Sequence, residues 1–159
     1  MKQDKTNVMR ILDGKKIPYV SHTYEPDAAL SGAQVAALLG EEESAVFKTL
    51  VTRGKTGGHY VFVIPVAEEL DLRKAARAAG EKSVDMIRQK ELLPLTGYIH
   101  GGCSPIGMKK AFPTFIHETA REHETICVSA GKVGAQIELS PADLAGAVRA
   151  VYADLVAGG

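Results

Sequence analysis

The stretch from Gly97 to Lys110 contains the residue types that hold an anion or a reacting carbonyl group. It reads Gly-Tyr-Ile-His-Gly-Gly-Cys-Ser-Pro-Ile-Gly-Met-Lys-Lys. Glycine permits positive φ and a close approach of the backbone to a ligand, and Pro105 stiffens the turn. Such a loop can present backbone N–H groups to a phosphate or to a carbonyl oxygen that becomes an oxyanion. A tight turn between two strands explains the glycines alone equally well.

Lys48 is the second candidate for chemistry, because it lies in an apolar segment. Residues 45–52 read as a strand, in which Lys48 shares one face with Val46 and Leu50 while the residues between them line the other face. Both faces are expected to be buried. A buried ammonium group normally has a partner or a function. The alternative is an edge-strand lysine that prevents aggregation.

No side chain stands out as a nucleophile. Ser104 precedes a proline and lacks the G-x-S-x-G context of a serine hydrolase. A catalytic Cys103 would need a nearby base or cation, for which His100 and Lys109 are the candidates. A free cysteine is more often a small buried hydrophobic residue, and this is the interpretation we favour.

The sequence predicts no metal site and no cofactor. Cys103 and Cys127 are far apart, and no CxxC motif is present. We expect the remaining histidines to be structural or on the surface, because no spacing joins them into a zinc site; they are His22, His59, His117 and His123.

Composition indicates one soluble globular domain over residues 1–159, with 45% hydrophobic and 24% charged residues. Lysine plus arginine equals aspartate plus glutamate at 19 each, so the net charge does not attract nucleic acid. A polyanionic partner must therefore be bound locally or with help from another protein. No apolar run is long enough to span a bilayer and no signal segment is apparent, so we expect a cytoplasmic protein without membrane contact.

Helices and short strands alternate along the chain, and hairpins outnumber βαβ units. A capping box of Ser31 and Gln34 predicts a helix to Leu39, and a helical turn from Gln89 is expected to end before Pro94. Ser140 should begin a last helix that runs to Leu155 and packs across the sheet. The other expected helices are 7–13 and 71–79, and the expected strands are 17–23, 45–52, 59–65, 84–87, 98–100, 114–118, 125–129 and 136–139. The predicted fold class is α+β, with a mixed, mostly antiparallel, barrel-like sheet and flanking helices.

The motifs, taken in order, resemble those of the YbaK family of Cys-tRNA(Pro) deacylases, one of the editing domains associated with aminoacyl-tRNA synthetases. Each motif is weak alone, but the ordered set is specific and spans nearly the whole chain. The matching stretches are His22-Thr23-Tyr24-Glu25, Val46-Phe47-Lys48-Thr49-Leu50, Gly97-Tyr98, Gly101-Gly102-Cys103-Ser104-Pro105-Ile106-Gly107, Lys109-Lys110, Val128-Ser129-Ala130-Gly131-Lys132 and Ile137-Glu138-Leu139.

The resemblance implies a mixed β-barrel with aminoacyl-tRNA deacylase activity, and it gives roles to individual residues. Lys48 corresponds to the essential lysine of the family, and Gly101 with Gly102 corresponds to the loop that positions the substrate. The implied substrate-binding residues are Tyr24, Ser129, Ser104, Pro105 and Gln136. The sequence departs from the family at Gln136, where several relatives carry aspartate, and near Leu30 and Ser31, where the usual aromatic residue is missing.

The resemblance also implies a mechanism without a protein nucleophile. In the family, the thiol of the cysteinyl group attacks its own ester carbonyl and forms a cyclic thiolactone. We expect Lys48 to hold the ribose-phosphate end or the developing negative charge, and Gly101 and Gly102 to supply backbone contacts to the reacting group. Ser129 and Tyr24 would orient the ribose hydroxyl or the amino group.

The implied partners are proline-specific aminoacyl-tRNA and prolyl-tRNA synthetase. Editing has a physical motive, because a site for a small amino acid rejects a competitor of similar size by only about 1–3 kcal/mol. Two alternatives remain open: hydrolysis by water of Ala-tRNA(Pro) or another small aminoacyl-tRNA, and a module without activity that binds the synthetase or the tRNA.

Overall fold

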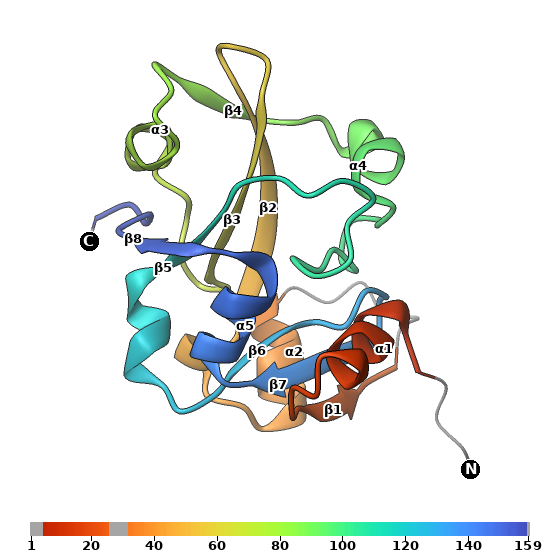
Figure 1. Ribbon diagram of the computed structural model, residues 1–159. Coiled ribbons are helices and arrows are strands. Elements are labelled where there is room, and N and C mark those ends of the chain that lie inside the picture. The colour runs from red at the N-terminus through yellow and green to blue at the C-terminus, as the bar shows by residue number, and fades with distance from the viewer. Residues whose placement is uncertain (1–4, 26–31, 159) are drawn as a thin grey trace.

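The computed structural model describes residues 5–25 and 32–158, and its backbone forms two sheets with helices around them (Figure 1). The helices are α1 (Asn7–Gly14), α2 (Gly32–Leu39), α3 (Leu72–Ala79), α4 (Gln89–Thr96) and α5 (Pro141–Val148), with 3₁₀ turns η1 (Glu43–Ala45) and η2 (Glu118–Glu122). The strands are β1 (Val20–Thr23), β2 (Phe47–Gly54), β3 (His59–Pro65), β4 (Val84–Met86), β5 (Thr114–His117), β6 (Ile126–Ser129), β7 (Ala135–Leu139) and β8 (Val151–Ala153). Within the two described ranges, no helix is long and apolar enough to cross a membrane.

The larger sheet has the order β4-β2-β3-β5-β8, and the smaller one has the order β1-β7-β6. All pairs in the smaller sheet are antiparallel, as are β2–β3 and β2–β4, whereas β3–β5 and β5–β8 are parallel. The two sheets meet at a parallel bridge between Val46 and Cys127, which brings the start of β2 beside β6. The prediction of a mixed, mostly antiparallel sheet with flanking helices is therefore confirmed.

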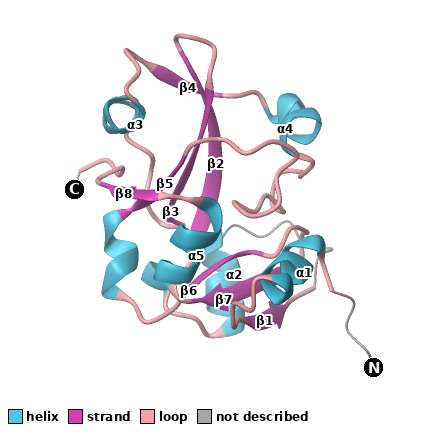
Figure 2. Cartoon of the chain, viewed as in Figure 1, coloured by secondary structure: helices cyan, strands magenta, loops and turns pink. Residues whose placement is uncertain are grey.

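The main core lies between the two sheets and is closed by α1 and α5 (Figure 2). Its fully buried members include Val8 of α1, Ile116 of β5, Ile137 of β7 and Leu144 of α5. Strand β3 contributes alternate residues to two clusters. Val61 and Val63 face this core, whereas Phe62 and Ile64 face α3. Strands β2, β6 and β7 also contribute residues to the cavity of the candidate site.

Two helices have the end signals that their sequences predict. The Asp71 side chain accepts hydrogen bonds from the N–H groups of Arg73 and Lys74 at the start of α3, and Gly80 ends the helix with φ +74°. At α5 the Ser140 hydroxyl oxygen accepts from the Asp143 N–H, and a proline occupies the first turn. The cap proposed for α2 involves Ser31, which lies outside the described residues.

The last helix is shorter than predicted. Helix α5 ends at Val148, because Arg149 takes a left-handed conformation with φ +55° and turns the chain back. Residues Val151–Ala153 then pair with β5 as strand β8. Leu155, expected on the helix, is buried in the second core beneath α3.

Two predictions around residue 94 were wrong. Helix α4 continues through Pro94 to Thr96. Proline has no N–H to donate to the carbonyl of Lys90, but Lys90 is exposed, so water can take the place of that donor. Tyr98 to His100 do not form a strand. The Tyr98 N–H donates to the Thr96 hydroxyl instead, and the Tyr98 hydroxyl donates to the carbonyl of Ile106, so local bonds replace a sheet partner.

Candidate active site

The candidate site is a cavity of about 240 Å³ in the gap where β2 and β6 diverge from their bridge. Pockets for drug-sized ligands usually measure about 300–1,000 Å³, so this cavity suits a smaller group. The predicted residues that line it are Lys48, Gly101, Tyr24, Ser129 and Gln136. These residues come from four separate segments of the chain, so the fold brings them together as expected.

One wall of the cavity is the edge of β2 that β3 does not occupy. On the β3 side the Val46 carbonyl accepts from the Val66 N–H, and on the opposite side the Val51 carbonyl accepts from the Ile87 N–H. Backbone groups alternate sides along an antiparallel strand. The N–H and C=O of Thr49 therefore point to the cavity side, because β4 pairs with β2 only from residue 52 onward.

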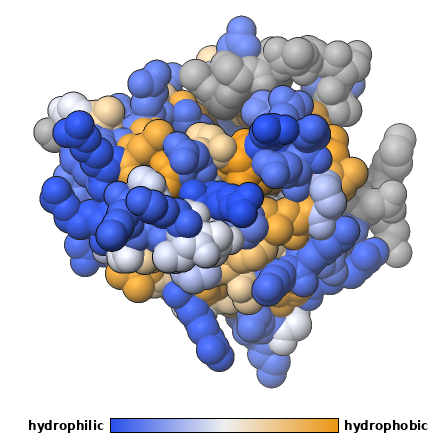
Figure 3. Space-filling view, turned by 90° about the horizontal axis from the view of Figure 1, so that it is seen from above, coloured by the Kyte–Doolittle hydropathy of each residue, from blue (hydrophilic) through white to orange (hydrophobic). Residues whose placement is uncertain are grey.

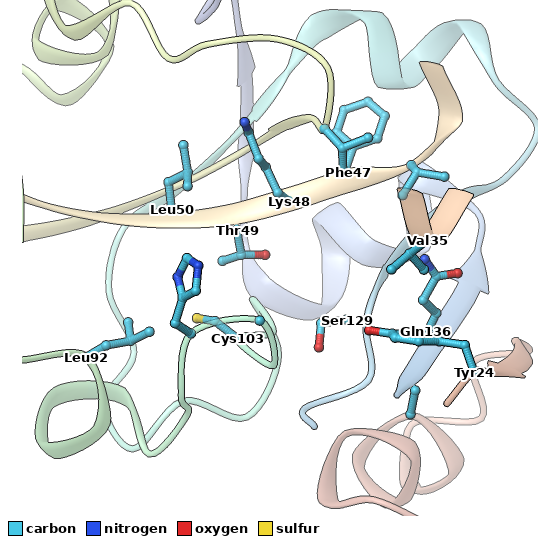
Figure 4. A pocket seen from close by; sticks show the side chains of 15 residues that line it. Tyr24, Val35, Phe47, Lys48, Thr49, Leu50, Leu92, Cys103, Ser129 and Gln136 are labelled. Atoms are coloured by element: carbon cyan, nitrogen blue, oxygen red, sulfur yellow. The ribbon is translucent and has the colours of Figure 1, made fainter. Parts of the chain in front are cut away.

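Lys48 is half-buried in this wall. Figure 4 shows Lys48 and Leu50 on one side of β2 and Thr49 on the other, as the strand alternation predicts. Among the ion pairs of residues 5–25 and 32–158, none includes Lys48. The ammonium group is thus a cation beside the cavity that has no counter-ion among the described residues, which suits an anionic group of a ligand.

Thr49 is a site residue that the sequence did not single out. Its side chain lies on the side of β2 that faces Cys103 and Ser129 (Figure 4). The Oγ1 atom is buried and has no hydrogen-bond partner within the described part of the chain. Buried hydroxyl groups are normally paired, so an unpaired one in a cavity wall is a candidate ligand contact. Only the burial reveals it, since threonine is an ordinary residue in a strand.

The two glycines of the predicted loop have different positions. Gly101 lines the cavity with φ +88°, is exposed, and has an N–H that donates no hydrogen bond to any described residue. Gly102 is buried, and its N–H donates to the carbonyl of Ile99 at 3.0 Å. A Cβ atom on Gly102 would lie 3.0 Å from the backbone N of Val133 and 3.1 Å from the Cα of Lys132.

The geometry gives the two glycines different tasks. The N–H of Gly102 is already used inside the loop, and Gly102 is not among the residues that line the cavity. This glycine instead lets the loop approach the turn at residues 132–133 closely. We therefore expect the backbone contact to the substrate to come from Gly101.

Ser104 and Pro105 are both buried and lie outside the lining of the cavity. The Ser104 hydroxyl oxygen accepts from the N–H of Ile106 at 3.2 Å, which closes the turn. Pro105 lines a separate depression beside α5. Their positions give them a part in the shape of the loop and no contact with this cavity.

Ser129 and Tyr24 are fixed by the turn between β6 and β7. The Ser129 hydroxyl oxygen accepts from the N–H of Gly131 at 3.1 Å, which leaves its hydrogen to donate. The backbone N–H of Tyr24 donates to the carbonyl of Gly134 at 3.0 Å. Ser129 lies opposite Gln136 in the ladder, so both side chains face the same side of the smaller sheet.

Gln136 is tied to a carboxylate behind the cavity wall. With its amide nitrogen toward Glu41, it donates to the two carboxylate oxygens at 2.7 and 3.0 Å. Burial raises the pKa of Glu41, and nearby His22 opposes that rise. The amide carbonyl of Gln136 is then free to face the other way. No sequence signal indicated this pair, because the two residues are 95 positions apart.

Cys103 lines the cavity and remains a buried neutral thiol. Burial raises the pKa of Cys103 to about 12. A nucleophilic cysteine needs a lowered pKa, so the structure agrees with the interpretation of Cys103 as a small hydrophobic residue.

We predict that Cys103 reacts slowly with iodoacetamide at pH 8. A thiol with a pKa of 9 is about one-tenth ionised at that pH, whereas a pKa of about 12 leaves about one part in ten thousand as thiolate. The alkylation rate, followed by mass spectrometry of the Cys103 peptide, should be roughly 1,000-fold below that of a free cysteine and should rise with pH. Modification as fast as that of a free thiol would contradict the assignment.

The face viewed from above in Figure 3 mixes hydrophobic patches with hydrophilic side chains. The chain as a whole has a formal net charge of zero. A net charge of zero gives the molecule as a whole no electrostatic attraction to a polyanion.

Comparison with known proteins gives consistent matches. Residues 25–147 match a family model described as an aminoacyl-tRNA editing domain. The chain is 47% identical, over 96% of its length and 94% of the relative, to an Enterococcus faecalis protein named "Putative Cys-tRNA(Pro)/Cys-tRNA(Cys) deacylase EbsC". A solved structure of hypothetical protein APE2540 is 28% identical with a TM-score of 0.85, over 94% of this chain and 98% of that one. A structure titled as "a putative trans-editing enzyme for prolyl tRNA synthetase" is 24% identical with a TM-score of 0.80, over 98% of this chain and all of that one.

Proposed function

This chain belongs to the aminoacyl-tRNA editing domain family and is an aminoacyl-tRNA deacylase, and from that premise we propose that its substrate is mischarged Cys-tRNA(Pro). The observation behind this choice concerns the thiol in the small cavity. Cys103 is the only cysteine among the described residues that line it, and burial keeps its thiol neutral. A substrate that brings its own thiol does not need a protein nucleophile. The 47% identical relative is named for the same aminoacyl group.

The proposed reaction is an intramolecular acyl transfer. The cysteinyl sulfur, after losing its proton to water, attacks the ester carbonyl carbon and forms a C–S bond. The C–O bond to the ribose then breaks, the ribose oxygen takes a proton, and free tRNA leaves beside a cyclic thiolactone. Water later opens the thiolactone to cysteine. The protein must therefore position the ester and stabilise the charge on the carbonyl oxygen.

Six residues that line the cavity are suited to these tasks. The Lys48 ammonium, which forms no ion pair with any described residue, offers a positive charge to the ribose-phosphate end or to the developing oxyanion. The Gly101 N–H and the Thr49 hydroxyl offer hydrogen bonds at the carbonyl. We assign Ser129 and Tyr24 to orient the ribose hydroxyl or the amino group, and the Gln136 carbonyl to accept from the substrate ammonium.

We propose prolyl-tRNA synthetase as the partner that delivers the tRNA. A protein with a formal net charge of zero binds tRNA weakly by itself, because affinity for nucleic acid depends on neutralised phosphates. Delivery by a synthetase that already holds the tRNA would remove this limit.

Single-turnover deacylation of Cys-tRNA(Pro), Ala-tRNA(Pro) and Pro-tRNA(Pro), with and without the synthetase, tests the proposal. We expect loss of the cysteinyl ester only, with a thiolactone that can be trapped. Loss of the alanyl ester at a similar rate would show that water is the nucleophile. Loss of none of the three, even with the synthetase, would refute the assigned substrate.

We predict that Thr49→Val separates activity from stability. Deacylation should fall about 2–10-fold, the loss expected for one neutral hydrogen bond, while the free energy of unfolding stays equal or rises because a buried unpaired hydroxyl is removed. Thr52→Val is the matched control, since the Thr52 hydroxyl donates to the Tyr60 carbonyl at 3.1 Å. It should lower stability and leave the rate of folded protein unchanged. The reverse pattern would exclude Thr49 from the site.

A further inference from the structure

A second group of reactive side chains lies on the smaller sheet beyond the cavity. His22 of β1 lies opposite Gln136 of β7, and Cys127 of β6 lies opposite Glu138 of β7. Because alternate residues of a strand share a face, His22, Cys127 and Glu138 point to the same side of the sheet. This is the side on which Glu41 approaches Cys127 and Gln136.

The donor atoms of this group converge on one point. The ligating atoms of His22, Cys127 and Glu138 all lie within 4.8 Å of one another, and His22 Nε2 is 2.8 Å from Glu138 Oε1. An oxygen of Glu41 lies 3.6 Å from Cys127 Sγ and 3.9 Å from His22 Nε2. A thiol, an imidazole and two carboxylates therefore lie close enough together to bind one cation.

We propose that His22, Cys127 and Glu138 form a zinc-binding site, with Glu41 or water as the fourth ligand. The combination of sulfur, nitrogen and carboxylate oxygen is typical of Zn²⁺ and unsuited to Mg²⁺ or Ca²⁺. Zinc bonds of about 2.0–2.3 Å place tetrahedral ligands about 3.3–3.6 Å apart. The His22 and Glu138 donor atoms are 2.8 Å apart, and no two of the three donor atoms are more than 4.8 Å apart. Side-chain rotations are therefore enough to bring the three donors to the spacing that zinc requires.

The surroundings of the group support a metal ligand set. Thr125 donates a hydrogen bond to the second oxygen of Glu138, which orients the first oxygen toward His22. Cys127 is buried, whereas the side chains of His22 and Glu138 are 28% and 32% exposed. A cation can therefore enter from solvent and bind a thiolate on the inner side.

Without metal, hydrogen bonds hold the side chains of this group together, and zinc would replace the hydrogen atoms in these bonds. The hydrogen between His22 Nε2 and Glu138 Oε1 and the thiol hydrogen that Cys127 directs at Glu41 both lie where the cation would bind. Binding therefore releases protons and exchanges two hydrogen bonds for metal bonds. None of the site's three main ligands lines the cavity, and the link between the two places is Glu41, which accepts from the cavity residue Gln136.

The test uses the whole protein, purified with chelator, and two probes. We expect one equivalent of Zn²⁺ per chain in competition with a chromogenic chelator. Co²⁺ should give the absorption of a tetrahedral site, with a thiolate-to-cobalt charge-transfer band in the near ultraviolet. Both signals should be lost in Cys127→Ser and retained in Cys103→Ser, which replaces the other buried cysteine. Glu138→Gln should weaken zinc binding at least about tenfold, and it provides the test if Cys127→Ser fails to fold.

Wild-type protein that binds no zinc, or a cobalt complex without the thiolate band, would overturn the proposal. Equal zinc affinity in wild type and in folded Cys127→Ser would overturn it as well. The melting temperature gives a second reading, since zinc should raise it in wild type and in Cys103→Ser and have no effect on Cys127→Ser.

Discussion

Replacement of Lys48 by alanine is expected to lower the single-turnover rate of Cys-tRNA(Pro) deacylation by about 100-fold or more. The Lys48 ammonium is the cation beside the cavity, and no described residue forms an ion pair with it. Loss of one group that stabilises developing charge in an enclosed site typically costs about 10²–10³ in rate. The rate should be measured at saturating substrate, so that it reports the chemical step.

The fold should tolerate this substitution, because a half-buried lysine at a strand edge contributes little packing. Lys55→Ala is the matched control, since Lys55 is an exposed lysine in the turn that joins β2 to β3. It should retain the wild-type rate. A wild-type rate at saturating substrate for Lys48→Ala would remove Lys48 from the mechanism.

Gly102→Ala is expected to damage both stability and activity. The added methyl group would lie 3.0–3.1 Å from backbone atoms of Lys132 and Val133, which cannot rotate away as a side chain would. Overpacking of this kind costs about 1–3 kcal/mol. Gly101 follows any displacement of its neighbour, and a shift of 1 Å in a positioning group can lower a rate about 100-fold.

Thermal unfolding and single-turnover kinetics of the same preparation measure the two effects. Gly146→Ala makes the same change in α5, where a Cβ meets no atom within 4 Å. This control should be about 0.5–1 kcal/mol more stable than wild type and fully active. If Gly102→Ala matched the control in both measurements, close packing of the loop would not be needed for the site.

Local signals in the sequence were sufficient for many of the elements. Asp71 with Gly80, and Ser140 with Pro141, mark helix ends through bonds between close neighbours, and the structure has those bonds. Arg149 gave no such signal, because its left-handed conformation depends on how the residues after it pack against the rest of the chain. Strand β8 exists only because β5 offers it a free edge, which no local pattern can reveal.

The residues of the candidate site also differ in whether local sequence reveals them. Alternation in a strand was enough to set Lys48 apart, since one charged residue in an apolar segment is visible in the sequence. The bond that occupies the Gly102 N–H and the missing partner of Thr49 are properties of the folded chain. The contact between Glu41 and Gln136 and the cluster of His22, Cys127 and Glu138 join residues from distant segments. Their spacing in sequence carries no information about them.

The walls of the cavity belong to two different sheets that touch at the Val46–Cys127 bridge. Lys48 and Thr49 lie on the wall from the larger sheet, whereas Ser129 and Gln136 lie on the wall from the smaller one. Substitutions on the second wall can therefore alter the shape offered to an amino acid while the strand that carries the lysine keeps its own ladder. The lysine and the residues opposite it are thus supported by separate hydrogen-bond ladders, so a change in one wall need not displace the other.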